Sequence, residues 1–243
     1  MFIHADIEPL AWDSQFFGLS TARLNIITAS SPSAVSVTAA KLDEYALVQA
    51  KVPAQQVYLI DQLSALGFSL VEGEADLLLS ISPEKAGRDQ ALITATSQDI
   101  PLLKAAAASV FSTSRFRTPW YQVNDSGRFY ATWVEKAVLG TFDHECLLVN
   151  DECGNPAGFV TMRKIGSHEA RIGLLAAMPG KLQQGIGKKL MSAAQQWCHN
   201  HEIQCLRIAT QISNITALRL YTRSGATIES TAYWLYRGRN DSI

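Results

Sequence analysis

The fold is decided by one segment near the C-terminus, Leu174-Leu175-Ala176-Ala177-Met178-Pro179-Gly180-Lys181-Leu182-Gln183-Gln184-Gly185-Ile186-Gly187-Lys188-Lys189-Leu190. It predicts a strand, a glycine-containing turn and a helix, because apolar residues recur at helical spacing from Leu190 to Cys198. The first amides of a helix have no partner within it and carry the positive end of the helix dipole. Glycines at 185 and 187 leave those amides open to phosphate oxygens, so the segment predicts a pyrophosphate-binding turn. Close packing of the strand and the helix is the alternative reason for these glycines.

Two other phosphate sites do not fit this segment. A P-loop ends in Gly-Lys-Ser/Thr, whereas Gly187 is followed by Lys188-Lys189. A dinucleotide-binding turn needs a third glycine and a later acidic residue for the ribose.

A second motif follows the turn. Residues 203–210 predict a strand, Asn214 is placed to cap the next helix, and Tyr221 lies two helical turns further on. The order of strand, glycine turn, Asn214, Tyr221 and Gly225-Ala226 resembles the GNAT acetyltransferase superfamily. The resemblance covers about residues 91–237 and implies acetyl-CoA as the co-substrate.

The resemblance implies roles for these residues. Tyr221 is expected to be the general acid that protonates the departing thiolate when an amine attacks the thioester directly; core packing is the alternative. Main-chain amides near Leu174–Ala176 are the oxyanion candidates, since Gly173 favours a bulge in this strand. Such proteins usually carry Gln or Arg where this chain has Leu182, so neighbouring side chains and amides are expected to serve instead. The expected coenzyme-binding residues are Leu175, Gln183, Gln184, Gly185, Ile186, Gly187, Lys188 and Asn214.

The order of elements predicts an α/β fold of the α+β type. A hairpin over 146–162 precedes the glycine turn, and a helix links that turn to the next strand, which favours a mixed, mostly antiparallel central sheet. The polar stretch 80–89, with Pro83 and Gly87, predicts a linker. This places a smaller N-terminal α/β domain at 1–90 and the GNAT acetyltransferase domain at 91–243.

Within the first domain, residues 33–49 predict a helix and 57–60 a strand. Two parts of the chain share an order of helix, glycine and two strands, around Gly67 and again around Gly225. This order fits either a duplicated half-domain or the ordinary use of glycine to leave a helix.

Further motifs are similar to those of nucleotide-sugar N-acetyltransferases within the same superfamily. They are residues 7–18 (IEPLAWDSQFFG), 66–74 (LGFSLVEGE), 114–117 (SRFR), 140–144 (GTFDH) and 229–237 (ESTAYWLYR). The similarity implies acetylation of the 4-amino group of dTDP-4-amino-4,6-dideoxy-D-galactose, in the synthesis of enterobacterial common antigen.

An acceptor that carries a diphosphate calls for positively charged side chains. Arg115, Arg117 and Arg128 flank aromatic residues and are the candidates, with solvated surface arginines as the alternative. The residues do not rank the possible general bases, and a chain of water molecules could replace them. The candidates are His144, Glu135, Asp143, His168 and Glu169.

Composition excludes several classes of protein. Lys plus Arg (21) nearly cancels Asp plus Glu (22), which disfavours a nucleic-acid partner. The apolar runs are too short for membrane insertion, and the absence of a signal-like start predicts a cytoplasmic protein. The four cysteines, at 146, 153, 198 and 205, do not have metal-ligand spacing, so no metal is expected.

Two alternative functions stay open. A GNAT enzyme that acetylates a peptide or a polyamine would favour an acidic acceptor site over arginines. A non-catalytic module that senses CoA or a nucleotide would have no use for an acid at Tyr221. A homodimer is compatible with either reading.

Overall fold

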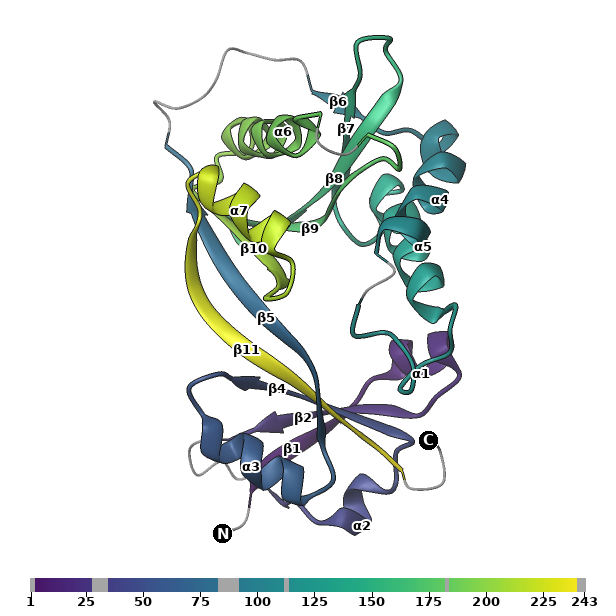
Figure 1. Ribbon diagram of the computed structural model, residues 1–243, viewed down its shortest axis with the longest axis vertical. Coiled ribbons are helices and arrows are strands. Elements are labelled where there is room, and N and C mark those ends of the chain that lie inside the picture. The colour runs from purple at the N-terminus through teal and green to yellow at the C-terminus, as the bar shows by residue number, and fades with distance from the viewer. Residues whose placement is uncertain (1–2, 28–34, 83–91, 112–113, 182–183, 240–243) are drawn as a thin grey trace. The chain divides into compact units, whose positions relative to one another are not determined.

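The structure is a computed structural model, which describes residues 3–27, 35–82, 92–111, 114–181 and 184–239 (Figure 1). Within these ranges, no helix is long and apolar enough to cross a membrane. The chain forms two compact units, each built from several segments. Unit 1 contains residues 1–74, 114–125 and 231–243, and unit 2 contains residues 75–113 and 126–230. The predicted division at residue 90 falls in the stretch 83–91, outside the described residues, and stays a prediction.

Unit 1 is a sheet with short helices. Strand β1 is antiparallel to both β2 and β3, while β2 runs parallel to β4. On the edge away from β2, β4 pairs antiparallel with residues 232–238 of β11 (Thr227–Gly238). The other elements that belong wholly to unit 1 are β1 (His4–Pro9), α1 (Ala11–Phe17), β2 (Thr21–Ile26), β3 (Val35–Ser36), α2 (Ala39–Leu42), β4 (Leu47–Pro53) and α3 (Val57–Ala65).

Unit 2 holds a sheet in the order β11-β5-β10-β9-β8-β7-β6. The strands β6 to β9 are joined by antiparallel pairs, and β9 is parallel to β10, so the predicted mixed, mostly antiparallel sheet is confirmed. Its elements are β6 (Ile93–Thr94), η2 (Ser97–Asp99), α4 (Ile100–Val110), α5 (Asp125–Val138), β7 (Glu145–Asn150), β8 (Pro156–Lys164), β9 (Glu169–Ala177), α6 (Ile186–Asn200), β10 (Cys205–Gln211) and α7 (Ile215–Arg223).

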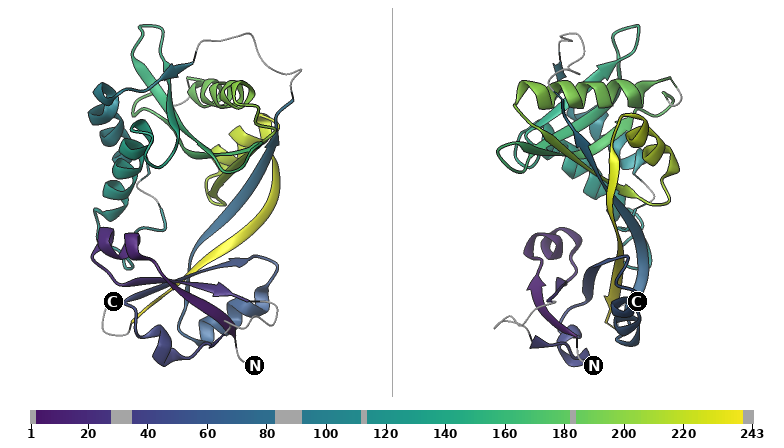
Figure 2. Two further views of the ribbon diagram at one scale, coloured as in Figure 1. Left: turned by 180° about the vertical axis from the view of Figure 1, so that it is seen from behind. Right: turned by 90° about the vertical axis from the view of Figure 1, so that its left-hand side faces the viewer.

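Helices cover both faces of β7, β8 and β9. Alternate side chains of a strand point to opposite faces, as Phe159 and Val160 do, and the irregular register of β9 between Ile172 and Leu175 puts Ile172 and Leu174 on opposite faces. Phe159 and Leu174 pack in one apolar cluster with α4 and α5. Val160 and Ile172 pack in another with α6. Figure 1 shows α6 on the opposite side of these strands from α4 and α5, and the right-hand view of Figure 2 shows α6 along its length.

The local patterns predicted some elements correctly and others wrongly. The hairpin of β7 and β8 and the start of α6 at the glycine turn are confirmed. Residues 57–60 begin α3 and are not a strand. Instead of the expected long helix over 33–49, the described residues form β3, the short α2 and the start of β4. Each of the two expected strand pairs, one after Gly67 and one after Gly225, is a single strand of 12 residues, β5 (Ser69–Ser80) and β11.

Candidate active site

Strand β9 carries a bulge at the predicted place. Its register against β8 shifts between the pairs Val160↔Leu175 and Met162↔Ile172, so β9 has one extra residue there. Gly173 lies in this interval, where an added Cβ would be 2.2 Å from a carboxylate oxygen of Asp143. The Leu174 amide donates to the Thr161 hydroxyl over 2.8 Å. The oxyanion candidates therefore narrow to the Leu175 amide, because the Leu174 amide already has a partner and the Ala176 amide faces β8 in the ladder.

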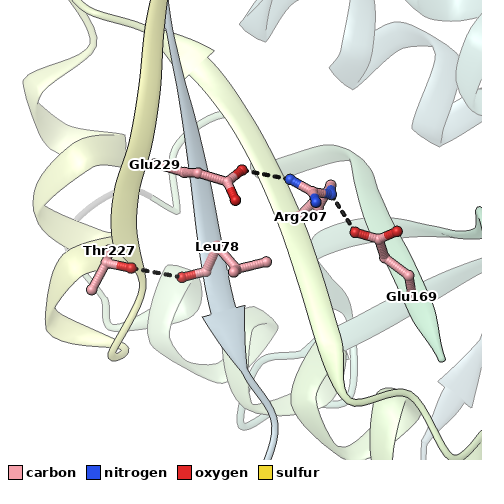
Figure 3. Close-up of polar contacts among 5 residues, drawn as sticks. All are labelled: Leu78, Glu169, Arg207, Thr227 and Glu229. Carbon is pink, nitrogen blue, oxygen red and sulfur yellow. Dashed lines mark hydrogen bonds and ion pairs between the residues drawn. The ribbon is translucent and has the colours of Figure 1, made fainter.

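The parallel strands β9 and β10 are paired over only a short stretch. The β9–β10 ladder spans only Glu169–Arg171 against Cys205–Arg207, although both strands continue beyond it. Arg207 joins Glu169 of β9 to Glu229 of β11 at this last paired position (Figure 3). Past it, the edge of β9 that carries Leu175 has no ladder to β10 within the described strands, which leaves main-chain groups available to a ligand.

The surroundings of the two glycines in the turn show which of them fits phosphate binding and which fits close packing. Gly185 has a φ of +72°, and an added Cβ there would meet no atom within 4 Å. At Gly187 an added Cβ would lie 2.9 Å from the Leu220 side chain of α7. Gly185 thus fits a turn that a phosphate can approach, whereas Gly187 allows two helices to pack closely.

The remaining turn residues differ in exposure. Ile186 is buried in the core of unit 2, so only its main chain can face a ligand. Gln184 and Lys188 are exposed. The predicted ligand Gln183 lies outside the described residues.

Helix α7 carries the second motif. Asn214 caps it, since its side-chain oxygen accepts from the Ala217 amide over 3.1 Å. Tyr221 is 5% exposed and belongs to the apolar cluster against which Leu175 also packs. Its hydroxyl has no hydrogen bond to any residue that the structure describes. Burial raises the pKa of Tyr221 to about 12, so this phenol keeps its proton at neutral pH.

Comparison with known proteins identifies the family. The model of the acetyltransferase (GNAT) family matches residues 110–226. A protein of Escherichia coli O6:H1 (strain CFT073), named dTDP-fucosamine acetyltransferase, is 44% identical over 237 residues, which cover 98% of this chain and 100% of that protein. The chain belongs to the GNAT acetyltransferase family.

Solved GNAT structures share the fold. A tandem GNAT protein from the clavulanic acid biosynthesis pathway superposes with a TM-score of 0.58 at 14% identity, covering 90% of this chain and 75% of that one. A GNAT protein of Kribbella flavida gives a TM-score of 0.54 at 14% identity, with 90% and 81% covered. Both show the fold alone, and the chain is an acetyltransferase on the strength of its family.

In this GNAT enzyme the three candidate arginines differ. Arg115 donates to the Gln49 side chain over 3.1 Å and to the Tyr236 hydroxyl, and its guanidinium lies 4.0 Å from the ring centroid of Trp234. Arg117 is exposed and donates to two main-chain carbonyls, those of Thr118 and Val71. Arg128 is exposed on α5.

Sequence reasoning missed the partners of Arg115. Gln49, Trp234 and Tyr236 come from β4 and β11, which are far from Arg115 along the chain. In the sequence, only the closely spaced aromatic residues of β11 indicated a packed cluster.

All five candidate bases are held by other groups of the enzyme, Asp143 by the Thr161 hydroxyl and the Trp133 indole. The Nδ1 atom of His144 accepts from the Lys164 amide, and that of His168 donates to the Glu202 carbonyl. Glu135 is paired with Lys104, and Glu169 with Arg207. Asp143 is buried. Among the described residues, no cluster of three or more His, Cys, Asp or Glu could hold a metal ion.

Proposed function

We propose that this acetyltransferase transfers the acetyl group of acetyl-CoA to the 4-amino group of dTDP-4-amino-4,6-dideoxy-D-galactose, and that the product serves enterobacterial common antigen synthesis. The observation that carries the proposal is the 44% identity to dTDP-fucosamine acetyltransferase over the whole of that protein. The match includes unit 1 and is not confined to the part shared by all GNAT proteins.

The residues of the glycine turn fit the diphosphate of acetyl-CoA. The open space at Gly185 and the unpaired first amides of α6 would take phosphate oxygens, with Gln183, Gln184, Ile186, Gly187 and Lys188 supplying further donors. The free edge of β9 at Leu175 would hydrogen-bond the pantetheine arm and the thioester carbonyl. Asn214 would contribute through the helix start that it caps.

Tyr221 would supply the proton for the departing thiolate. The amine attacks the thioester carbon, the carbon–sulfur bond breaks and the sulfur takes the phenol proton of Tyr221; the amine nitrogen loses one proton to water, and a proton from solvent then restores the phenol. A buried phenol without a hydrogen-bond partner among the described residues can turn its proton toward the sulfur, and its raised pKa keeps that proton in place until then. A thiol has an ordinary pKa near 8.5, well below that of this phenol, so the transfer must be concerted with bond breaking.

Arg117, in unit 1, and Arg128, in unit 2, are both exposed, so either could bind the diphosphate of the sugar nucleotide. Arg115 already uses Nη1 to hold Gln49 and Tyr236, and its guanidinium lies against the Trp234 ring. We therefore assign Arg115 a structural role in the packing of unit 1.

The test is acetyl transfer by the purified chain to dTDP-4-amino-4,6-dideoxy-D-galactose, with thiol release and product mass as readouts. The epimer with the D-gluco configuration, spermidine and a lysine peptide serve as matched acceptors. We expect kcat/KM for the galacto sugar to exceed that of each other acceptor at least about tenfold, as expected when a hydrogen-bonding site discriminates between stereoisomers. Faster acetylation of the peptide or spermidine would contradict the proposal. Sedimentation of the same sample tests the predicted homodimer, and cell fractionation tests the predicted cytoplasmic location.

A further inference from the structure

A buried polar chain lies behind the bulge of β9. Asp143 is 1% exposed and Thr161 is fully buried, in a cluster that is otherwise apolar. One carboxylate oxygen of Asp143, Oδ2, accepts from the Thr161 hydroxyl over 2.6 Å and from the Trp133 indole N–H over 2.7 Å. The Thr161 hydroxyl in turn accepts from the Leu174 amide. The chain therefore runs from a carboxylate through a hydroxyl to the main chain of the bulge.

The hydrogen bonds of this chain have only one possible direction. The Leu174 amide can only donate, and the Thr161 hydroxyl donates its single proton to Asp143. The lone pairs of the hydroxyl are then left facing the Leu174 amide. Asp143 thus fixes the orientation of the group that replaces a ladder partner for Leu174.

The carboxylate also touches the bulge directly. An added Cβ at Gly173 would meet the same oxygen of Asp143 at 2.2 Å and the Thr161 hydroxyl at 2.6 Å. The second oxygen of Asp143, Oδ1, is buried and has no hydrogen-bond partner in the described part of the chain. Burying a carboxylate with one oxygen unpaired is costly, whereas an apolar side chain would fill the same space without that cost. Stability alone therefore does not explain this arrangement.

We infer that Thr161, oriented by Asp143, is a positioning residue that holds the Leu174 amide away from the ladder and so aims the following amide, that of Leu175, at the thioester carbonyl from the unpaired edge of β9. The inference rests on the proposed function, because it assigns that amide to the transferred acetyl group. Thr161 and Asp143 act through the main chain of β9 and do not contact the substrate.

The test compares Thr161→Val, which keeps the shape but loses the hydroxyl, with Thr161→Ser, which keeps the hydroxyl. The matched control is Cys146→Ala, since Cys146 is the cross-strand partner of Thr161 and is buried on the same face. We expect Thr161→Val to lower kcat at least about tenfold, with KM for acetyl-CoA within about threefold of the native value. Thr161→Ser should restore kcat to within about threefold, and Cys146→Ala should keep it in that range although its Tm falls.

Two outcomes would overturn the inference. One is a kcat for Thr161→Val that falls no further than that of Cys146→Ala. The other is a Thr161→Ser enzyme that is as slow as Thr161→Val, because the hydroxyl would then not be the group that matters.

Amide hydrogen exchange keeps this test separate from that of the proposed function. If the native chain acetylates no amino sugar, the proposed function fails, and the inference is judged on exchange alone. Acetyl-CoA should then slow the exchange of the Leu175 amide about tenfold in the native chain and in Thr161→Ser, but not in Thr161→Val. Equal protection in Thr161→Val, or none in the native chain, overturns it.

Discussion

At the scale of single residues, Tyr221 combines burial with a hydroxyl that has no partner among the described residues. We expect Tyr221→Phe to lower kcat about 100-fold, the usual effect of losing a general acid, because phenylalanine keeps the ring and loses only the proton donor. Calorimetry should give an unchanged affinity for CoA. A kcat within a few-fold of native would remove Tyr221 from the chemistry and leave it a packing residue.

The same residue predicts the alkaline side of the pH profile. Burial raises the pKa of Tyr221 from 10.0 to about 12, so its proton-bearing form persists at every pH below that value. We therefore expect kcat not to decline between about pH 8 and pH 10, where an unshifted phenol would begin to ionise. Stopped assays at constant ionic strength would measure this, and a decline that is present in the native enzyme but absent in Tyr221→Phe would contradict it.

Arg115 and Arg117 stand two residues apart and provide a matched pair. Lysine keeps the charge but cannot both stack on Trp234 and bond Gln49 and Tyr236 as the guanidinium does. We expect Arg115→Lys to lower the free energy of unfolding by about 1–3 kcal/mol. Arg117→Lys should leave it nearly unchanged, because the Arg117 side chain is exposed. Urea unfolding measures both, and equal losses would show that the cluster around Arg115 does not stabilise unit 1.

At the scale of elements, the two glycines that begin α6 differ in what an alanine would meet. Gly185→Ala forces a residue with a Cβ into the left-handed region, at a cost of about 1–2 kcal/mol, and places a methyl group in the space assigned to phosphate. We expect it to weaken CoA binding about tenfold or more. Gly187→Ala meets Leu220 instead, so its main effect should be a lower Tm. Calorimetry and thermal unfolding of both variants test the assignment; equal CoA affinities would refute it.

The elements also show what could be predicted from sequence. The glycine turn, the cap at Asn214 and the bulge at Gly173 are local features, in which glycine or asparagine meets a requirement of the main chain. Strand β5 was divided in two because Glu74 and its polar neighbours interrupt the apolar pattern. Glu74 is bonded to Lys51 and to the Trp234 indole, and such distant partners leave no trace in local periodicity.

The same limit applies to the candidate site. Thr161 and Asp143 each look ordinary in the sequence, and only the folded chain brings them to the Leu174 amide. The sequence predicts a strand at residues 57–60, because a short apolar run fits a strand as well as a helix. In α3 two of these residues, Val57 and Tyr58, are exposed.

At the scale of the whole molecule, β5 and β11 each contribute residues to both units. A chain cut at residue 90 would give a C-terminal piece without β5, the strand between β11 and β10 in the sheet. We expect residues 91–243 expressed alone not to fold, and the full chain to unfold in one transition. Circular dichroism of the fragment and calorimetry of the full chain would measure this. A folded fragment, or two well-separated transitions, would contradict it.

The close approach of Gly187 to Leu220 has a consequence for timing within the catalytic cycle. Leu220 precedes Tyr221 on α7, while Gly187 stands in the first turn of α6. A shift of α6 when a coenzyme arrives would therefore press on the very turn that carries the phenol. Coenzyme binding and the placement of Tyr221 would then be coupled, so the phenol would be in position to protonate the thiolate only when the coenzyme is bound.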